Sequence, residues 1–130
     1  MRLLLDTHAL AWAVGAPQLL SRRALALLSE PQHTLLVSPV SLWEMSIKYR
    51  AGRWPEVAPF VDEQQYTAFA KRLGLEELPI RIPHARLAGQ FDTEHKDPFD
   101  RLLAAQALLE GVPLVSKDPA LSTFPVAIEW

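Results

Sequence analysis

Short apolar runs alternate with longer segments of mixed polarity along this chain. Three of the runs are continuous enough to predict strands that are buried on both faces, at residues 2–5, 34–37 and 113–115. Weaker strands are predicted at 77–80 and 126–128. The pattern therefore predicts four to five short strands, none of which directly follows another.

The segments between the strands have the apolar spacing of helices. Helices are predicted at residues 7–14, 21–29, 39–50, 63–73, 83–91 and 98–110. A capping residue followed by proline opens two of them, at Ser38-Pro39 and at Asp97-Pro98. The segment 54–62 contains two prolines and no clear period, and we expect a loop there.

Strands that alternate with helices predict an α/β protein built on a parallel sheet. The chain has 130 residues, which is the length of one domain, so we expect a single domain over residues 1–130. In such sheets the functional groups gather at the carboxyl ends of the strands. The residues that follow each strand are therefore the first place to look for chemistry.

Acidic residues follow several of the predicted strands or open the neighbouring helices. Five of the fifteen acids have such positions, namely Asp6, Glu44, Asp97, Asp100 and Asp118. Carboxylates brought this close together repel one another, and a cation resolves the conflict. Oxygen ligands without cysteine favour Mg²⁺ or Mn²⁺ over zinc.

Each of these acids also has a purely local explanation. Asp6, Asp97 and Asp118 could cap the helices or turns that follow them. Glu44 could pair with Lys48 one helical turn later, for roughly 0.2–0.5 kcal/mol. Five independent local roles are a weaker hypothesis than one shared site, and the shared site is the interpretation we favour.

Composition narrows the chemistry further. The chain has no cysteine, which excludes disulfides, thiolate metal sites and a cysteine nucleophile. Its net charge is -2. When the five clustered acids are left out, 13 basic and 10 acidic residues remain, which is an excess of positive charge. The weak acidity therefore does not exclude a polyanionic partner. No apolar stretch is long enough for a signal peptide or a membrane span, and we expect a cytoplasmic protein with no membrane partner.

Four motifs, taken in order and at their spacing, resemble a known family. They are LLDTHAL at residues 4–10, VSPVSLWE at 37–44, HKDPFDRLLAAQA at 95–107 and LVSKDP at 114–119. The chain resembles the PIN-domain ribonucleases, and specifically the VapC-type toxins of prokaryotic toxin–antitoxin pairs. The likeness implies a three-layer α/β/α sandwich around a parallel sheet.

The resemblance also implies residue roles and an activity. Metal-binding acids would be Asp6, Glu44 and Asp100, with Asp118 as a fourth, while Asp97 could bind metal or orient Asp100. The hydroxyls of Thr7 and Ser116 match positions that hold metal-bound water. The implied activity is cleavage of RNA phosphodiester bonds with one or two Mg²⁺ or Mn²⁺ ions. The implied partners are an antitoxin that covers the acidic cleft and a second copy of the chain.

Basic and aromatic residues near these motifs are candidates for substrate contact. We predict RNA contacts at Lys48, Arg53, Arg101 and Lys117, and base stacking by Trp12 or Trp54. Trp43 belongs to the apolar stripe of its helix, and we expect it in the core. We expect a structural or supporting role for His8 and a loop-shaping role for His95.

Two other classes of protein remain open at this point. A PIN-like domain could keep the fold and only bind a partner, although such a domain would not need the full set of repelling acids. A phosphotransferase or phosphatase of the α/β type also places an aspartate after its first strand. One such group needs a second aspartate two residues later, where this chain has His8.

Overall fold

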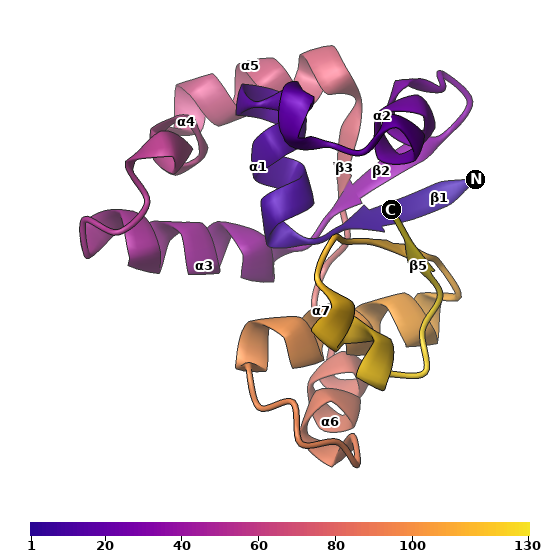
Figure 1. Ribbon diagram of the computed structural model, residues 1–130. Helices are drawn as coiled ribbons and strands as arrows, with labels where there is room; N and C mark the ends of the chain where they lie inside the picture. The colour runs from indigo at the N-terminus through magenta and orange to yellow at the C-terminus, as the bar shows by residue number, and fades with distance from the viewer.

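The computed structural model describes all residues from 1 to 130 and contains one sheet of five parallel strands (Figure 1). The strands are β1 (Arg2–Leu5), β2 (Thr34–Val37), β3 (Leu75–Glu77), β4 (Leu114–Val115) and β5 (Ile128–Glu129). Their order across the sheet is β3-β2-β1-β4-β5, and every neighbouring pair is parallel. The first strand therefore lies at the centre, between β2 from the first third of the chain and β4 from the last third.

Seven α-helices connect and cover the strands. They are α1 (Thr7–Gly15), α2 (Arg22–Ser29), α3 (Pro39–Arg50), α4 (Ala58–Val61), α5 (Glu63–Leu73), α6 (Ile82–Gln90) and α7 (Pro98–Glu110). Three short 3-10 helices lie at Pro17–Leu19, Pro55–Val57 and Pro119–Thr123. None of these helices is long and apolar enough to cross a membrane.

Alternation along the central strand divides the core into two halves. Leu3 and Leu5 of β1 belong to one buried cluster, and Leu4 between them belongs to the other. Both halves are apolar because helices cover both faces of the sheet, so the strand has no polar positions between Leu3 and Leu5.

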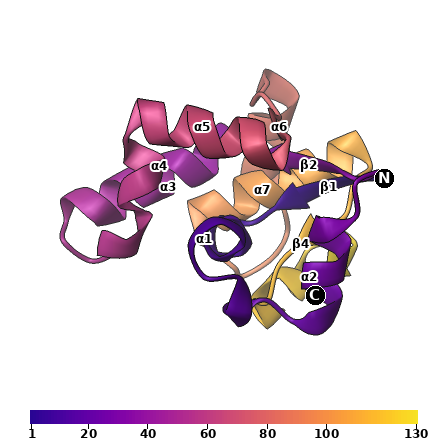
Figure 2. The same cartoon turned by 90° about the horizontal axis from the view of Figure 1, so that it is seen from above.

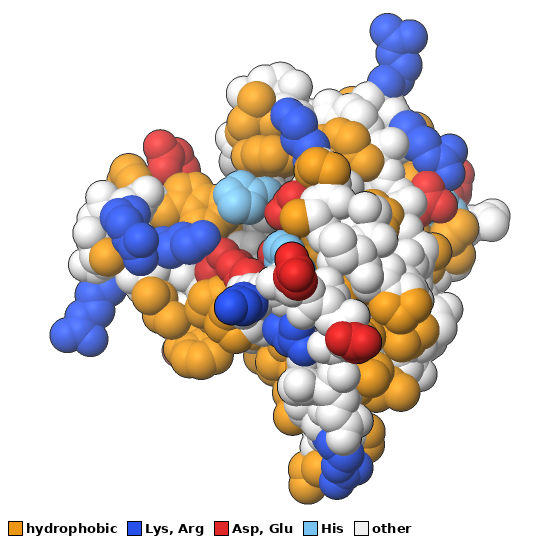
Figure 3. Space-filling model, turned by 60° about the horizontal axis from the view of Figure 1, so that its bottom comes forward, with side chains coloured by type: hydrophobic (Ala, Val, Ile, Leu, Met, Phe, Trp, Pro, Cys, Tyr) orange, Lys and Arg blue, Asp and Glu red, His pale blue; other side chains and the backbone are white.

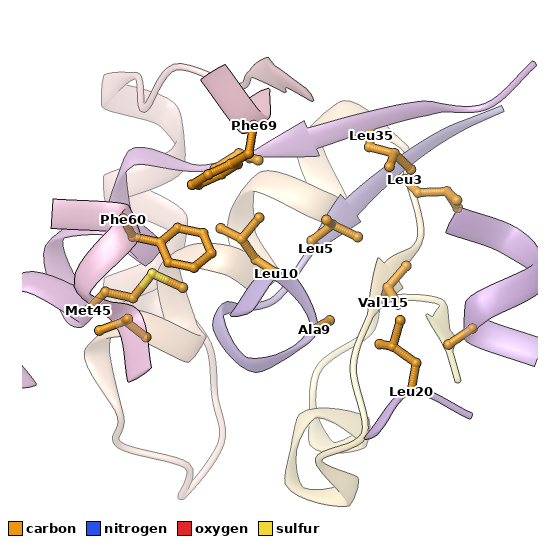
Figure 4. Packing of buried hydrophobic residues seen from close by; sticks show 13 residues of the cluster. Leu3, Leu5, Ala9, Leu10, Leu20, Leu35, Met45, Phe60, Phe69 and Val115 are labelled. Carbon is orange, nitrogen blue, oxygen red and sulfur yellow. The ribbon is translucent and has the colours of Figure 1, made fainter. Parts of the chain in front are cut away.

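Helices α1, α2, α4 and α5 cover the first face (Figure 1). Ala24, Phe60 and Phe69 come from the last three of these helices and belong to the same buried cluster as Met45 of α3. Figure 4 shows Met45 beside Phe60. The rings of Phe60 and Phe69 meet edge to face, with centroids 4.8 Å apart. This arrangement of aromatic rings is favourable beyond the area that it buries.

Helix α7 covers the second face, and α6 packs against α7. Helix α7 contacts the sheet through Leu103, Ala104 and Ala107, all of which are buried. The two alanines allow the helix to approach the sheet closely. The predicted α/β class, the parallel sheet of five strands and the three layers are therefore confirmed.

Three predicted boundaries were wrong. The last strand lies at Ile128–Glu129 instead of 126–128. The third strand is not at 77–80 but begins at Leu75, because Gly74 ends α5 in the left-handed conformation and turns the chain straight into the sheet. The segment 54–62 is not a loop: its two prolines stand in the first turns of short helices, where a missing N–H costs nothing.

Helix α3 buries a different face from the predicted one. Trp43 was expected in the core, but it is 59% exposed. The buried positions of α3 are Val40, Ser41, Glu44 and Met45, which are spaced by one helical turn on another side of the helix. This face includes a hydroxyl and a carboxylate, and both lie at the carboxyl end of the sheet. Figure 2 shows α3 extending from this end, opposite the N-terminus.

Candidate functional site

Asp6 follows the central strand directly. Its backbone amide donates to the carbonyl of Val115 on β4 at 3.0 Å, which fixes it at the point where β1 and β4 end. Its Oδ1 accepts a hydrogen bond from the amide of Ala9 at 2.7 Å and caps α1. The residue is only 6% exposed. The capping role is therefore real, and it uses one of the two carboxylate oxygens.

Glu44 reaches the same region from α3. The residue is buried, and its Oε2 lies 2.6 Å from the Nζ of Lys48, one turn further along the helix. The pair that could explain Glu44 locally is thus present. A buried carboxylate away from the first turn of a helix needs such a partner, because burial of an unpaired charge is costly.

Asp97 and Asp100 stand at the start of α7. Asp97 caps the helix, since its Oδ1 accepts a hydrogen bond from the amide of Asp100 at 3.0 Å. The Nε2 of His95 donates to Oδ2 of Asp100 at 2.8 Å. His95 therefore contacts the site directly, beyond the loop-shaping role expected for it.

Asp118 completes the group from the segment after β4. Its Oδ1 accepts a hydrogen bond from the amide of Ala120 at 2.9 Å, and its own amide donates to the hydroxyl of Ser116 at 3.0 Å. Ser116 is buried, and its side chain also hydrogen-bonds to Asp6. Thr7, likewise buried, donates to the hydroxyl of Ser41 at 3.1 Å. These hydroxyls connect segments that hold the acids.

One cavity of about 480 Å³ joins these side chains. All five predicted acids line it, and the remaining lining residues are Thr7, His8, Trp12, Lys48, Lys117 and Pro119. Figure 3 shows acidic side chains around a hollow on this face, with basic and histidine side chains beside them. Acids from four separate segments of the sequence thus meet in one place.

Burial raises the pKa of two of these carboxyls. The pKa of Asp6 is about 6, because desolvation outweighs its hydrogen bonds to Ser116 and Ala9, and the charges of Asp118 and Glu44 add to the rise. The pKa of Asp100 is also about 6: desolvation is again the largest cause, and the hydrogen bond from His95 opposes it. The cavity therefore holds more negative charge than its surroundings stabilise.

The donor set fits a hard divalent cation, since it consists of carboxylate oxygens with hydroxyls beside them. As the side chains stand, no three acidic or histidine groups lie close enough to hold an ion. Lys48 and His95 instead occupy one oxygen each of Glu44 and Asp100. Bringing the acids together on an ion would require these two partners to give up or share their contacts.

Arg101, which was predicted to contact RNA, does not line the cavity. Its guanidinium donates to the carbonyls of Ala88 and Phe91 at 2.7 Å each and of His95 at 2.8 Å. A fourth, longer bond reaches the carbonyl of Thr93. The guanidinium therefore donates its hydrogen bonds to the segment before α7 and holds His95 beside Asp100.

The other three residues predicted to contact RNA differ in whether they line the cavity. Lys48 and Lys117 line the cavity, whereas Arg53 does not. His8 and Trp12 also line it, and burial among its neighbours lowers the pKa of His8. The place of His8 could have been suspected from its position two residues after Asp6. No sequence signal indicated the contacts of Arg101, because backbone carbonyls in an irregular loop leave no residue pattern.

A five-stranded parallel sheet with acids gathered at the carboxyl ends of its strands defines a known class of α/β domain. The family model described as PIN domain matches residues 3–126. The chain belongs to the PIN domain family, as the resemblance of its motifs implied. A comparison with curated proteins found no match.

Solved structures with the same fold include proteins from three bacteria. VapBC2 from Rickettsia felis, bound to a DNA fragment from its promoter, has 19% identity and a TM-score of 0.69 over 99% of this chain and 98% of that one. VapC20 from Mycobacterium tuberculosis, a toxin that cleaves the sarcin-ricin loop, has 17% identity and a TM-score of 0.63, with 96% of both chains covered. FitAcB from Neisseria gonorrhoeae has 19% identity and a TM-score of 0.58, covering 97% and 95%. At these identities the likeness shows the shared fold.

Removing the charge of Asp6 should stabilise the metal-free protein at neutral pH. A carboxyl whose pKa is raised to about 6 favours folding at low pH, and this contribution is lost as the pH rises from about 4 through 6. Asp6→Asn keeps a capping oxygen and should raise the free energy of unfolding by ~2 kcal/mol at pH 7.5 in EDTA, and by less at pH 4.5.

Asp62→Asn is the matched control, because Asp62 caps α5 with an exposed side chain. Denaturant unfolding of both variants at pH 7.5 and pH 4.5 measures the free energy of unfolding. An Asp6→Asn protein that is less stable than the unsubstituted chain at pH 7.5 would contradict the electrostatic account.

Replacing Arg101 should loosen the segment before α7. Arg101→Lys keeps the charge but cannot serve four carbonyls with one ammonium group. We expect amide hydrogen exchange in residues 88–97 to become ~10-fold faster or more, since hydrogen bonds from charged groups contribute ~1.5–3 kcal/mol each. Arg53→Lys should leave exchange in this segment unchanged. Equal protection in both variants would show that the contacts of Arg101 do not hold the loop.

Proposed function

We propose that this protein is a metal-dependent endoribonuclease that acts as the toxin of a VapBC-type toxin–antitoxin pair. One observation carries the proposal: five carboxylates from four separate segments line a single cavity at the carboxyl ends of the strands. Burial of acids that repel one another destabilises the fold, and this arrangement makes physical sense when the acids bind a cation. Membership in the PIN domain family supports the same conclusion.

Asp6 and Asp100 are our first choices as direct ligands, with Glu44 and Asp118 completing the set. The first two are the carboxyls whose charged forms are least stable without a cation, as their raised pKa values indicate. A bound Mg²⁺ or Mn²⁺, as one or two ions, would offset the charge that develops on the phosphate and make a water more acidic. One of the carboxylates then accepts the proton of the attacking water.

The neighbouring residues orient these acids. Asp97 holds the start of α7 by its cap and so sets the position of Asp100. Ser116 hydrogen-bonds to Asp6 and receives the amide of Asp118, which ties two acids together. Thr7 is joined to Ser41, one turn before Glu44 on the buried face of α3. We assign Thr7 and Ser116 the role of holding ordered water near the acids.

RNA is the substrate we infer. Lys48 and Lys117 line the cavity beside the acids, where their ammonium groups can contact phosphates on either side of the cut. The solved structure of a toxin that cleaves the sarcin-ricin loop, which shares this fold, supports the assignment.

A second protein that covers the acidic cavity is the partner we infer. Two of the structures with this fold are of VapBC2 and FitAcB. An antitoxin segment with arginine side chains would neutralise the exposed carboxylates of Asp97 and Asp118 and exclude RNA from the same space.

We further infer that two copies of this chain pair through an apolar patch outside the cavity. Trp43 and Ile47 of α3 are exposed, and the ring of Trp43 contacts that of Phe99 on α7 at 5.3 Å. Exposed aromatic and aliphatic residues grouped in this way mark protein interfaces. An antitoxin suited to the acidic cavity would leave this patch for the second copy.

The two alternative classes make different predictions. A binding domain that does no chemistry would not bind Mn²⁺, so calorimetric titration with Mn²⁺ separates it from a nuclease. A phosphatase would hydrolyse a generic phosphate ester, and position 8, where one such group needs an aspartate, is a histidine in this chain.

We expect the purified protein to cleave single-stranded RNA with Mg²⁺ or Mn²⁺ and to lose this activity in EDTA. Asp6→Ala and Asp100→Ala should each reduce the cleavage rate at least ~100-fold, because each removes a metal-binding carboxylate. Gel analysis of total RNA and of tRNA measures the rate and maps the cut sites.

Asp92→Asn is the matched control, since Asp92 is an exposed acid outside the cavity. It should cleave at the unsubstituted rate. Activity that persists in EDTA, or that survives both alanine substitutions, would rule out the proposed mechanism.

Trp43→Ala should weaken pairing of two copies without unfolding the chain, because its side chain is mostly exposed. We expect sedimentation to give a dimer for the unsubstituted protein and a shift toward monomer for the variant. Leu25→Ala, which removes an exposed side chain from α2, should remain a dimer. A monomeric unsubstituted protein would contradict this part of the proposal.

A further inference from the structure

An aromatic surface borders the acidic cavity and is not used by the acids. It consists of His8, Trp12 and Trp54, which we call the aromatic wall. His8 and Trp54 are stacked, with ring centroids 4.8 Å apart and planes inclined by 27°. Trp12 lies 5.6 Å from His8 in a tilted arrangement. Both His8 and Trp12 line the cavity.

The wall is placed by the same elements that place the acids. His8 follows Asp6 by two residues and Trp12 lies one turn further along α1, so both rings project from the helix that Asp6 caps. Trp12 is backed by Trp130 at 5.8 Å, and Trp12 and Trp54 both pack against the first core cluster. The rings are therefore held in position, while His8 between them stays exposed.

A lysine stands over each outer ring of the wall. The Nζ of Lys48 lies 5.7 Å from the ring centroid of Trp54, and the Nζ of Lys117 lies 5.8 Å from that of Trp12. Both lysines also line the cavity. Cations over aromatic faces are attracted to them, so these contacts place one positive charge at each outer ring of the wall.

Aromatic faces with flanking positive charges are the elements with which proteins hold single-stranded nucleic acids. Bases stack on the rings, and the charges contact the backbone phosphates on either side. In an A-form duplex the base faces are covered by neighbouring bases and cannot stack on a protein. A cavity of about 480 Å³ has the size of a small-ligand site rather than of a groove for a duplex.

We propose that the aromatic wall is a nucleobase subsite that binds one unpaired base of single-stranded RNA beside the phosphate presented to the acids. The proposal rests on the proposed ribonuclease function and adds the side chains that hold a base of the single strand next to the cut. Lys48 and Lys117 contact the phosphates on either side of that base. Stacking tolerates every base, so the wall selects for an unpaired strand more than for a sequence.

The test measures RNA binding separately from cleavage. Asp100→Asn serves as a background that does not cut, and the probes are a fluorescein-labelled ten-residue oligouridine and the same strand paired with oligoadenine, both in Mg²⁺. Fluorescence anisotropy should show that the single strand binds at least ten times more tightly than the duplex. Equal affinity for the two would overturn the proposal.

Variants of the wall give the second arm. In the same background His8→Ala should weaken single-strand binding about 5- to 100-fold, whereas His8→Phe, which keeps a ring, should bind nearly as the background does. Thermal unfolding of both variants separates a loss of binding from a loss of stability, because His8→Ala also removes the stack on Trp54. Tyr49→Ala, which removes an exposed ring of α3 outside the cavity, should have no effect. Unchanged binding by His8→Ala would mean that the rings merely pack α1 in place.

The lysines and the cleavage assay supply the remaining readouts. Lys117→Ala should reduce the slope of log affinity against log salt by about 0.7, as for one lost phosphate contact on a single strand. If the unsubstituted protein binds single strands through the wall but does not cut RNA, the base-binding role of the wall is supported and the nuclease proposal is wrong. If it cuts RNA while His8→Ala binds normally in the Asp100→Asn background, the nuclease proposal is supported and the proposed base-binding role of the wall is wrong.

Discussion

The burial of acids at the ends of the central strands is the constraint on which the rest of this structure depends. Asp6 and Glu44 are buried in a cavity that also takes Asp97, Asp100 and Asp118. Much of the surrounding structure moderates their charge: Lys48 and His95 each pair with one acid, and backbone amides donate to three others. The fold thus tolerates a set of charges that is unfavourable in itself, and a divalent cation would give them a common partner.

The fold was largely predictable because both faces of its sheet are covered. Buried strands must be continuously apolar, and the runs at β1 and β2 stand out for that reason. The exceptions have local causes. Strand β3 is short and mostly exposed, so its two glutamates look like loop residues, and its position depends on the turn at Gly74. The prolines near α4 resemble loop signals but occupy helix starts.

The site was predictable as far as strand ends and sequence motifs determine it. All five acids do meet in one cavity, because parallel strands place the residues that follow them at one edge. The direction in which side chains point was harder to predict from the sequence. Trp43 was assigned to the core because apolar spacing on α3 is equally compatible with another face, and the face that is buried contains Ser41 and Glu44. The contacts of Arg101 depend on a loop whose path no spacing rule describes.

The order of the strands links assembly of the cavity to the completion of the chain. Strand β1 pairs on one side with β2 and on the other with β4, whose partner residues lie more than a hundred positions further along, as in the pairing of Leu4 with Leu114. Until β4 is in place, Asp6 lacks the backbone bond to Val115, and Asp118 is not yet positioned beside it. A growing chain on the ribosome would therefore hold its acids apart for most of its synthesis. The complete cavity would therefore form in a single late step, when the last two strands join the sheet.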